Sequence, residues 1–261
     1  MTSPLAEFAL LARLPDEVLD VEPLVVSIAR MGDPKLELRA VAAELDRLAE
    51  QIADSIAPSA PPDRLAASLA AQIGGTLGFR GEPSDYRHAE SSYLDRVLER
   101  RRGLPILLAT VWSLLGRRLG VRIEGIAWPG HFLACVMVPG ARIYVDPFGG
   151  GAAVEASTLL ARLPPGVGRK VLDPAPTRAI GVRMLHNLKA LHLDQEDPKR
   201  ALEVVDRLLL LGGERAEEVR DRGLLLSALG RDGEARRDLE RYLTLAPGAP
   251  DRARIEALVR R

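Results

Sequence analysis

The chain has 261 residues, of which 47% are hydrophobic and 28% charged, enough apolar material for one large domain or two small ones. Lys plus Arg equals Asp plus Glu at 36 each, so charge gives no reason to expect nucleic acid or an anionic membrane as a partner. The single cysteine, Cys135, excludes an intrachain disulfide. No signal peptide or membrane-spanning stretch is recognised, and we expect a cytoplasmic protein.

The N-terminal part, residues 4–56, is predicted to be helical. In Leu36–Ile56 the apolar residues recur at spacings of three and four, as on one face of an amphipathic helix. Three prolines between residues 57 and 62 then exclude a helix interior. Asp63 is expected to cap the next helix, which should end near Gly74.

A buried helix followed by three strands is predicted in the middle of the chain. After a short helix over Ser91–Arg102, Pro105 suits the first position of a helix that runs to about Leu119 and is apolar nearly all round. The period then changes, which indicates strands at about 121–126, 132–138 and 142–146. The fold class is therefore α+β, with one buried helix packed on an antiparallel sheet.

The C-terminal part is predicted to be a helical repeat. A short helix (154–163) and a connector (164–180) come first, and then Ala201 and Ala235, which lie 34 residues apart, open similar phrases. This period resembles that of tetratricopeptide repeats. The expected domains are an N-terminal helical region (1–60), a core (61–180) and the repeats (181–261), which bind a partner or only cap the core.

Two polar residues stand where the predicted strands begin and end. His131 follows Pro129-Gly130 at the start of one strand, and Asp146 ends the next. Antiparallel neighbours can bring an imidazole and a carboxylate together as a base and its orienter. The alternatives are a structural histidine and a turn aspartate that caps local N–H groups.

Several phrases together resemble the SirB-type branch of the transglutaminase-like superfamily. They are Gly78-Phe79-Arg80-Gly81, Ser92-Tyr93-Leu94 with Arg96-Val97-Leu98, Arg101-Arg102-Gly103-Leu104-Pro105-Ile106, Pro129-Gly130-His131-Phe132-Leu133 and Asp146-Pro147-Phe148-Gly149-Gly150. The resemblance implies a papain-like core flanked by N-terminal helices and C-terminal repeats. It makes His131 the base and Asp146 the orienter, and it places Pro105 at the nucleophile position. Ser91 replaces the usual asparagine, so no role for that amide is carried over.

Proline has no nucleophilic side chain, so the resemblance implies that thiol acyl transfer is absent. Cys135 is no replacement, because four strand residues separate it from His131 by about 13 Å, and we expect it to be a small buried hydrophobe. Ser92 is either a helix cap or a hydroxyl that faces the cleft. The other candidate cleft residues are Tyr93, Trp128 and Phe148, although Trp128 could equally be core packing.

Three functions are open on these observations. The first is a non-catalytic pseudoenzyme that binds a protein or peptide in a regulatory role. The second is a hydrolase or amidase of altered chemistry, in which His131 is the base and Asp146 orients it. The attacking group would then be a hydroxyl or a water molecule. The third is a regulator whose core is only structural. No cofactor or metal is expected, since the four histidines lack metal-binding spacing. The oligomeric state stays open.

Overall fold

The computed structural model describes residues 3–260. They form two compact units, one made of residues 20–180 and the other of residues 3–19 together with 181–260. The first unit holds the sheet and its helices, and the second is wholly helical. Residues 4–12 therefore belong with the C-terminal helices, although they lie at the other end of the sequence.

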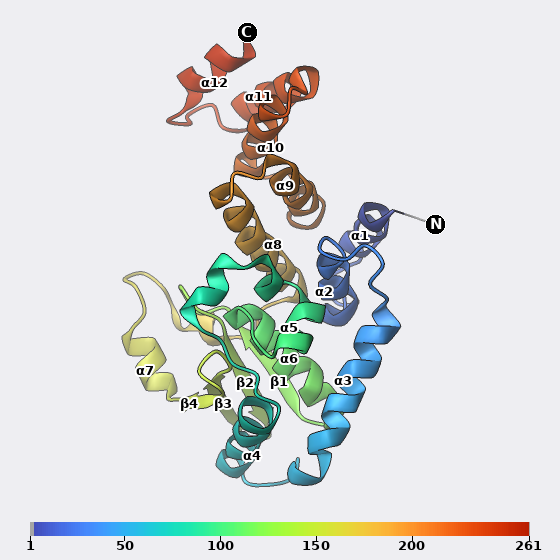
Figure 1. The fold of residues 1–261 in the computed structure, drawn as a ribbon. Helices are drawn as coiled ribbons and strands as arrows, with labels where there is room; N and C mark the ends of the chain where they lie inside the picture. The colour runs from blue at the N-terminus through green and yellow to red at the C-terminus, as the bar shows by residue number, and fades with distance from the viewer. Residues whose placement is uncertain (1–2, 261) are drawn as a thin grey trace. The chain divides into compact units, whose positions relative to one another are not determined.

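The larger unit opens with helices that surround one buried helix (Figure 1). In chain order the helical elements are α2 (Val21–Ala29), α3 (Leu38–Ile52), η1 (Ala53–Ser55), α4 (Pro62–Leu69), η2 (Ala70–Thr76), η3 (Pro83–Arg87), η4 (Ala89–Ser92), α5 (Leu94–Arg100), α6 (Pro105–Arg118), α7 (Ala156–Ala161) and η5 (Arg169–Leu172).

Helix α6 is the predicted central helix. Pro105 occupies its start, as the sequence indicated, and most side chains on every face are buried. Trp112 is fully buried, and its ring lies so close to Gly151 that a Cβ there would be 2.4 Å away. The continuous apolar pattern of this segment thus reflects burial on all sides.

The sheet has the order β1-β2-β3-β4, with every pair antiparallel. Its strands are β1 (Arg122–Ile126), β2 (Leu133–Val138), β3 (Ala141–Asp146) and β4 (Ala152–Val154). The first three confirm the predicted strands and the α+β class. The fourth was not predicted, because three residues after a glycine-rich turn are too short for a periodic pattern.

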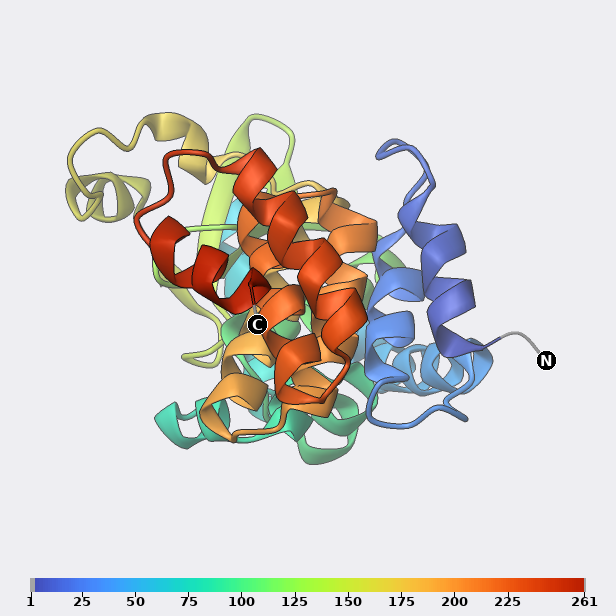
Figure 2. The ribbon, with the colours of Figure 1, turned by 90° about the horizontal axis from the view of Figure 1, so that it is seen from above.

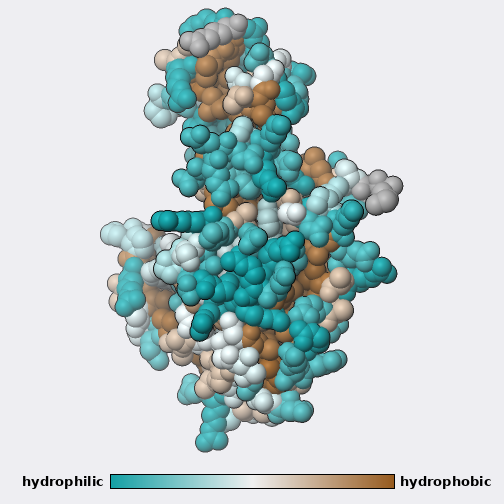
Figure 3. Space-filling model, in the orientation of Figure 1, coloured by the Kyte–Doolittle hydropathy of each residue, from teal (hydrophilic) through white to brown (hydrophobic). Residues whose placement is uncertain are grey.

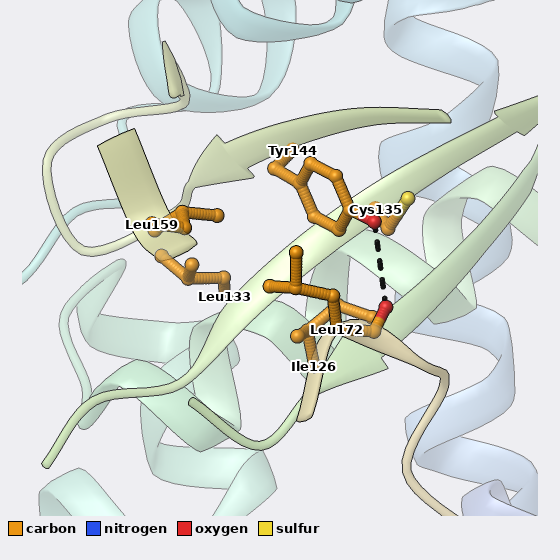
Figure 4. Packing of buried hydrophobic residues seen from close by; sticks show 6 residues of the cluster. All are labelled: Ile126, Leu133, Cys135, Tyr144, Leu159 and Leu172. Atoms are coloured by element: carbon orange, nitrogen blue, oxygen red, sulfur yellow. Dashed lines mark hydrogen bonds between the residues drawn. The ribbon is translucent and has the colours of Figure 1, made fainter. Parts of the chain in front are cut away.

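The two faces of the sheet are covered by different elements. Gly116 of α6 packs on Ile123, so α6 covers the face that carries Ile123 and its partner Val136. Cys135 points to the opposite face because side chains alternate along a strand. There it belongs to a buried apolar cluster that also includes Leu159 of α7 and Leu172 of η5 (Figure 4).

Two predicted helix caps are wrong. Helix α4 begins at Pro62 with Pro61 as its N-cap, so Asp63 lies inside the first turn. The N-cap of α5 is Tyr93, and no side chain there bonds the helix, so Ser92 is not the cap. In addition, α8 (Thr177–Asp194) begins within the segment that looked like a connector.

The described residues of the second unit form helices joined by turns and loops (Figure 2). Besides α8 these are α1 (Pro4–Ala12), α9 (Pro198–Gly212), α10 (Ala216–Ala228), α11 (Asp232–Leu245) and α12 (Arg252–Val259). Gly223 lets α10 and α11 approach closely, because a Cβ there would be 2.8 Å from Leu239. Phe8 of α1 is fully buried, and the Arg207 guanidinium of α9 lies 5.8 Å from its ring centroid. Helix α1 therefore completes the packing of α9.

Within residues 3–260, none of the helices combines the length and the apolar character needed to cross a bilayer.

Candidate functional site

His131 and Asp146 lie within hydrogen-bond distance, with His131 Nε2 and Asp146 Oδ1 2.9 Å apart. Asp146 is the last residue of β3, and His131 follows a tight turn in which its N–H donates to the Trp128 carbonyl at 3.0 Å. Gly130 has a φ of +76°, a conformation that glycine adopts without strain. The Pro-Gly-His phrase thus serves to turn the chain and present the imidazole. Its catalytic role stays a prediction.

Asp146 is held as a carboxylate. Burial alone would raise its pKa, but the hydrogen bond and charge of His131 and the N–H groups of Phe148 and Gly149 outweigh burial, so the pKa is lowered. The Phe148 N–H donates to the same oxygen at 3.0 Å. An ionised carboxylate can only accept hydrogen bonds, so we assign the imidazole proton to Nε2. In the neutral ring the other nitrogen, Nδ1, is then the basic one.

Two aromatic side chains extend from this pair toward solvent. The Phe148 ring meets the His131 ring edge-on at 6.0 Å, and Tyr86 lies 6.3 Å from Phe148 and is half exposed. Sequence reasoning missed Tyr86, because it lies in a short 3₁₀ helix with no periodic signal. The only available hint was its place between two of the family phrases.

The phrase Gly78-Phe79-Arg80-Gly81 packs directly on the phrase Asp146-Pro147-Phe148-Gly149-Gly150. The Gly81 N–H donates to the Phe148 carbonyl at 3.0 Å, and a Cβ at Gly81 would lie 2.0 Å from the Phe148 ring. A Cβ at Gly74 would similarly meet the Gly150 carbonyl at 2.0 Å. Glycine is therefore required at both positions, because the two chain segments lie too close together for a side chain. This close packing keeps Phe148 against His131.

Pro105 lies toward the same end of the sheet as His131. Helix α6 ends at Arg118, β1 begins at Arg122, and Gly116 packs back on Ile123, so the chain reverses its direction between the helix and the strand. The start of α6 therefore points to the end of β1, which leads into the turn before His131. Pro105 is buried and offers no nucleophile there.

The remaining cleft candidates are placed less favourably. Ser92 and Tyr93 are only 3% and 4% exposed. The Tyr93 ring packs on Gly32 so closely that a Cβ on this glycine would lie 2.8 Å from the ring. Trp128 packs on the apolar cluster around Leu133, on the sheet face away from α6. Of the four candidates, Phe148 is the one whose side chain has a described contact with the His131 ring.

Cys135 is a buried hydrophobe, as predicted. Its side chain is fully buried in the cluster with Tyr144 and Leu172 (Figure 4). The Tyr144 hydroxyl donates to the Leu172 carbonyl at 3.4 Å and closes this side of the sheet. Burial raises the pKa of the Cys135 thiol to about 11, so the thiolate is scarce near neutral pH. Within the described part of the chain, no group of three or more metal-binding side chains gathers.

Comparison with known families gives the class of protein. The family model of the transglutaminase-like superfamily matches residues 39–186, and a tetratricopeptide-repeat model matches residues 188–260. The first match covers more than half of the chain. The protein therefore belongs to the transglutaminase-like superfamily and carries tetratricopeptide repeats in its C-terminal part.

Individual relatives place it beside the SirB-type proteins. A "UPF0162 protein" of Xylella fastidiosa (strain 9a5c) is 40% identical over 180 residues, which cover 66% of this chain and 64% of that protein. A "UPF0162 protein" of Vibrio cholerae is 32% identical over 184 residues, 66% of each chain. "Protein SirB1" of Salmonella typhimurium is 25% identical over 192 residues, 71% of each chain. The chain thus spans 64% of the length of the Xylella relative. No solved structure matches it significantly.

Proposed function

We propose that the chain is a non-catalytic, cytoplasmic regulatory protein that binds a protein or peptide through its degenerate cleft and its C-terminal repeats. The observation that carries the proposal is Pro105. It occupies the start of the buried helix, where the resemblance requires a nucleophile, while the only thiol is buried on the opposite face of the sheet. A site with a base and an orienter but no attacking side chain cannot form an acyl-enzyme.

The repeats support the binding half of the proposal. Helical repeats stack into extended surfaces suited to partner segments. Between α8 and α10, Lys189 Nζ bonds Glu218 at 2.8 Å and Asp221 at 2.9 Å. Lys189 and Asp221 remain 13% and 18% exposed, so this fixed polar cluster reaches the surface. A partner could therefore meet charged groups that are already held in place.

One observation favours the alternative of a hydrolase with altered chemistry. The His131–Asp146 hydrogen bond fixes the imidazole and leaves Nδ1 basic, while the His131 side chain is 26% exposed. In that reaction Nδ1 takes a proton from water as the water oxygen attacks a carbonyl carbon. The imidazolium, stabilised by the Asp146 carboxylate, then returns the proton to the leaving amine or alcohol.

Turnover separates the two proposals. The purified chain and its His131→Ala variant are compared on a panel of peptide amides, isopeptides and esters. The binding proposal expects no turnover above the variant in any of them. Turnover that His131→Ala abolishes, in a variant with an unchanged unfolding midpoint, would overturn it in favour of the hydrolase.

Partner capture tests the role of the repeats. Deleting residues 182–261 would also uncover Phe8 of α1, so substitution is the sharper tool. The double variant Lys189→Gln with Asp221→Asn keeps the shape of the cluster and removes two of its three charges, leaving that of Glu218. We expect this variant to lose a partner that the parent chain retains in quantitative crosslinking, while tryptophan fluorescence shows the larger unit still folded. Undiminished capture would refute the role of this surface.

A further inference from the structure

A shallow hollow lies between α3 and α5, away from the residues discussed above. Its volume is about 310 Å³, which suits one or two side chains and is small for a cofactor. Figure 3 shows apolar surface on this face between more hydrophilic rims. The lining consists of four apolar residues and three acids: Leu36, Ala40, Val41, Leu98, Glu44, Asp95 and Glu99.

All charged side chains in this lining are acids. Glu44 pairs with Arg47 at 2.6 Å and Arg101 at 3.2 Å, and Glu99 pairs with Arg96 at 3.2 Å. These arginines lie outside the lining, and the side chains of Arg47 and Arg96 are 49% and 44% exposed. Exposed ion pairs contribute little to stability. A cation from a partner can therefore replace Arg47 or Arg96 at small cost, whereas Arg101 is less exposed and lies over the Phe79 ring.

Asp95 is the most buried of the three acids. Its side chain is 15% exposed, its Oδ2 lies 3.4 Å from Arg96 Nε, and its buried Oδ1 has no hydrogen-bond partner. Burial raises the pKa of this carboxyl. Since Oδ1 is buried, the exposed part of this carboxylate lies on the side of Oδ2, where a cationic donor that enters the hollow can contact it.

From these contacts we infer that the α3–α5 hollow is a docking site for a basic, amphipathic segment of a partner protein, in which a leucine-like side chain fills the apolar floor and a neighbouring lysine or arginine reaches the acid rim. Lysine and arginine carry long apolar stems below their charged groups, so one such residue satisfies floor and rim together. The hollow shares no residue with the His131 site or the repeats, so this inference stands or falls separately from the proposed function.

The test uses the full chain and a labelled synthetic peptide of about four helical turns with a repeated Leu-Lys-Lys-Leu pattern. Fluorescence anisotropy measures its Kd at low and at physiological salt. Two control peptides replace every Lys by Glu or every Leu by Ser. We expect only the Leu-Lys peptide to bind, with an affinity that falls as salt rises because the rim contacts are electrostatic.

The matched variants locate the binding. Asp95→Asn with Glu99→Gln should weaken the peptide about tenfold, whereas Glu50→Gln, an exposed acid of α3 outside the lining, should leave Kd unchanged. Ala40→Trp fills the hollow from an exposed position and should abolish binding without disturbing the core.

Each of the following results would overturn the inference. The parent chain does not bind the Leu-Lys peptide, or it binds the Glu-containing peptide equally well. The Asp95→Asn, Glu99→Gln variant has the same Kd as Glu50→Gln, or Ala40→Trp binds undiminished. Each variant is first checked for an unchanged tryptophan-fluorescence unfolding midpoint. Peptide-dependent self-association of the chain in place of one-to-one binding would also contradict it.

Discussion

Asp146 offers the clearest single perturbation of the site. Its carboxylate accepts from His131 Nε2 at 2.9 Å and from the Phe148 N–H at 3.0 Å, and the Gly149 N–H also lowers its pKa. In Asp146→Ala the imidazole loses its partner and two backbone donors lose their acceptor. Hydrogen bonds to a charged group are each worth about 1.5–3 kcal/mol. Since the Asp146 side chain is 28% exposed, water replaces part of this, and we expect a net loss of about 2–3 kcal/mol.

The loss should depend on pH in a defined direction. The pKa of Asp146 is lower in the folded state than the ordinary value of about 3.9 in the unfolded chain. The stabilisation is therefore complete above about pH 5 and disappears as pH falls through the unfolded and then the folded pKa. The penalty of Asp146→Ala should be constant from neutral pH down to about pH 5 and shrink below that.

Tryptophan fluorescence reports on the relevant unit alone, because both tryptophans, Trp112 and Trp128, lie in residues 20–180. For a unit of this size the expected loss corresponds to a drop in melting temperature of roughly 5–10 °C. The matched control is Asp54→Ala, an exposed acid in the same unit. Equal melting temperatures for the two variants at neutral pH would refute the reasoning.

Three further predictions follow from packing. Cys135, fully buried and with a pKa of about 11, should resist alkylation in the native chain and react only in urea; rapid native labelling would contradict its placement. Phe8→Ala should lower the stability of the second unit by about 3–5 kcal/mol. We expect faster hydrogen exchange in α9 and an unchanged unfolding midpoint by tryptophan fluorescence. A lowered midpoint with unchanged exchange in α9 would show that α1 supports the other unit. Gly81→Ala should destabilise by about 1–3 kcal/mol because its methyl meets Phe148, whereas Gly168→Ala, with no atom within 4 Å, should be neutral; similar midpoints would contradict the close approach.

The long, strongly patterned elements were predictable from the sequence. Helix α6 follows from Pro105 at its start and apolar residues on every side, and β2 follows from an unbroken apolar run. Such patterns report burial, which is what the fold must satisfy first. The family phrases around His131 and Asp146 added the expectation that these two residues meet.

Features decided by tertiary contacts were not predictable in the same way. Strand β4 is held by pairing with β3 and has too few residues to show a period. Asp63 and Ser92 are suitable cap residues by type. The actual N-caps are Pro61, two residues before Asp63, and Tyr93, one residue after Ser92. Tyr86 joins the site because Phe148 and Gly81 fold back toward it, a contact between distant segments that local pattern does not encode.

Restoring a nucleophile tests the central claim that Pro105 occupies a vacated catalytic position. In Pro105→Cys the thiol would lie at the start of α6, toward the end of the sheet that carries His131. Ultraviolet thiolate absorbance is titrated in this variant and in its combination with His131→Ala. The account predicts a thiolate well below the ordinary pKa of about 8.5, shifted upward when His131 is removed. A thiol that titrates at or above the ordinary value and ignores His131 would contradict it.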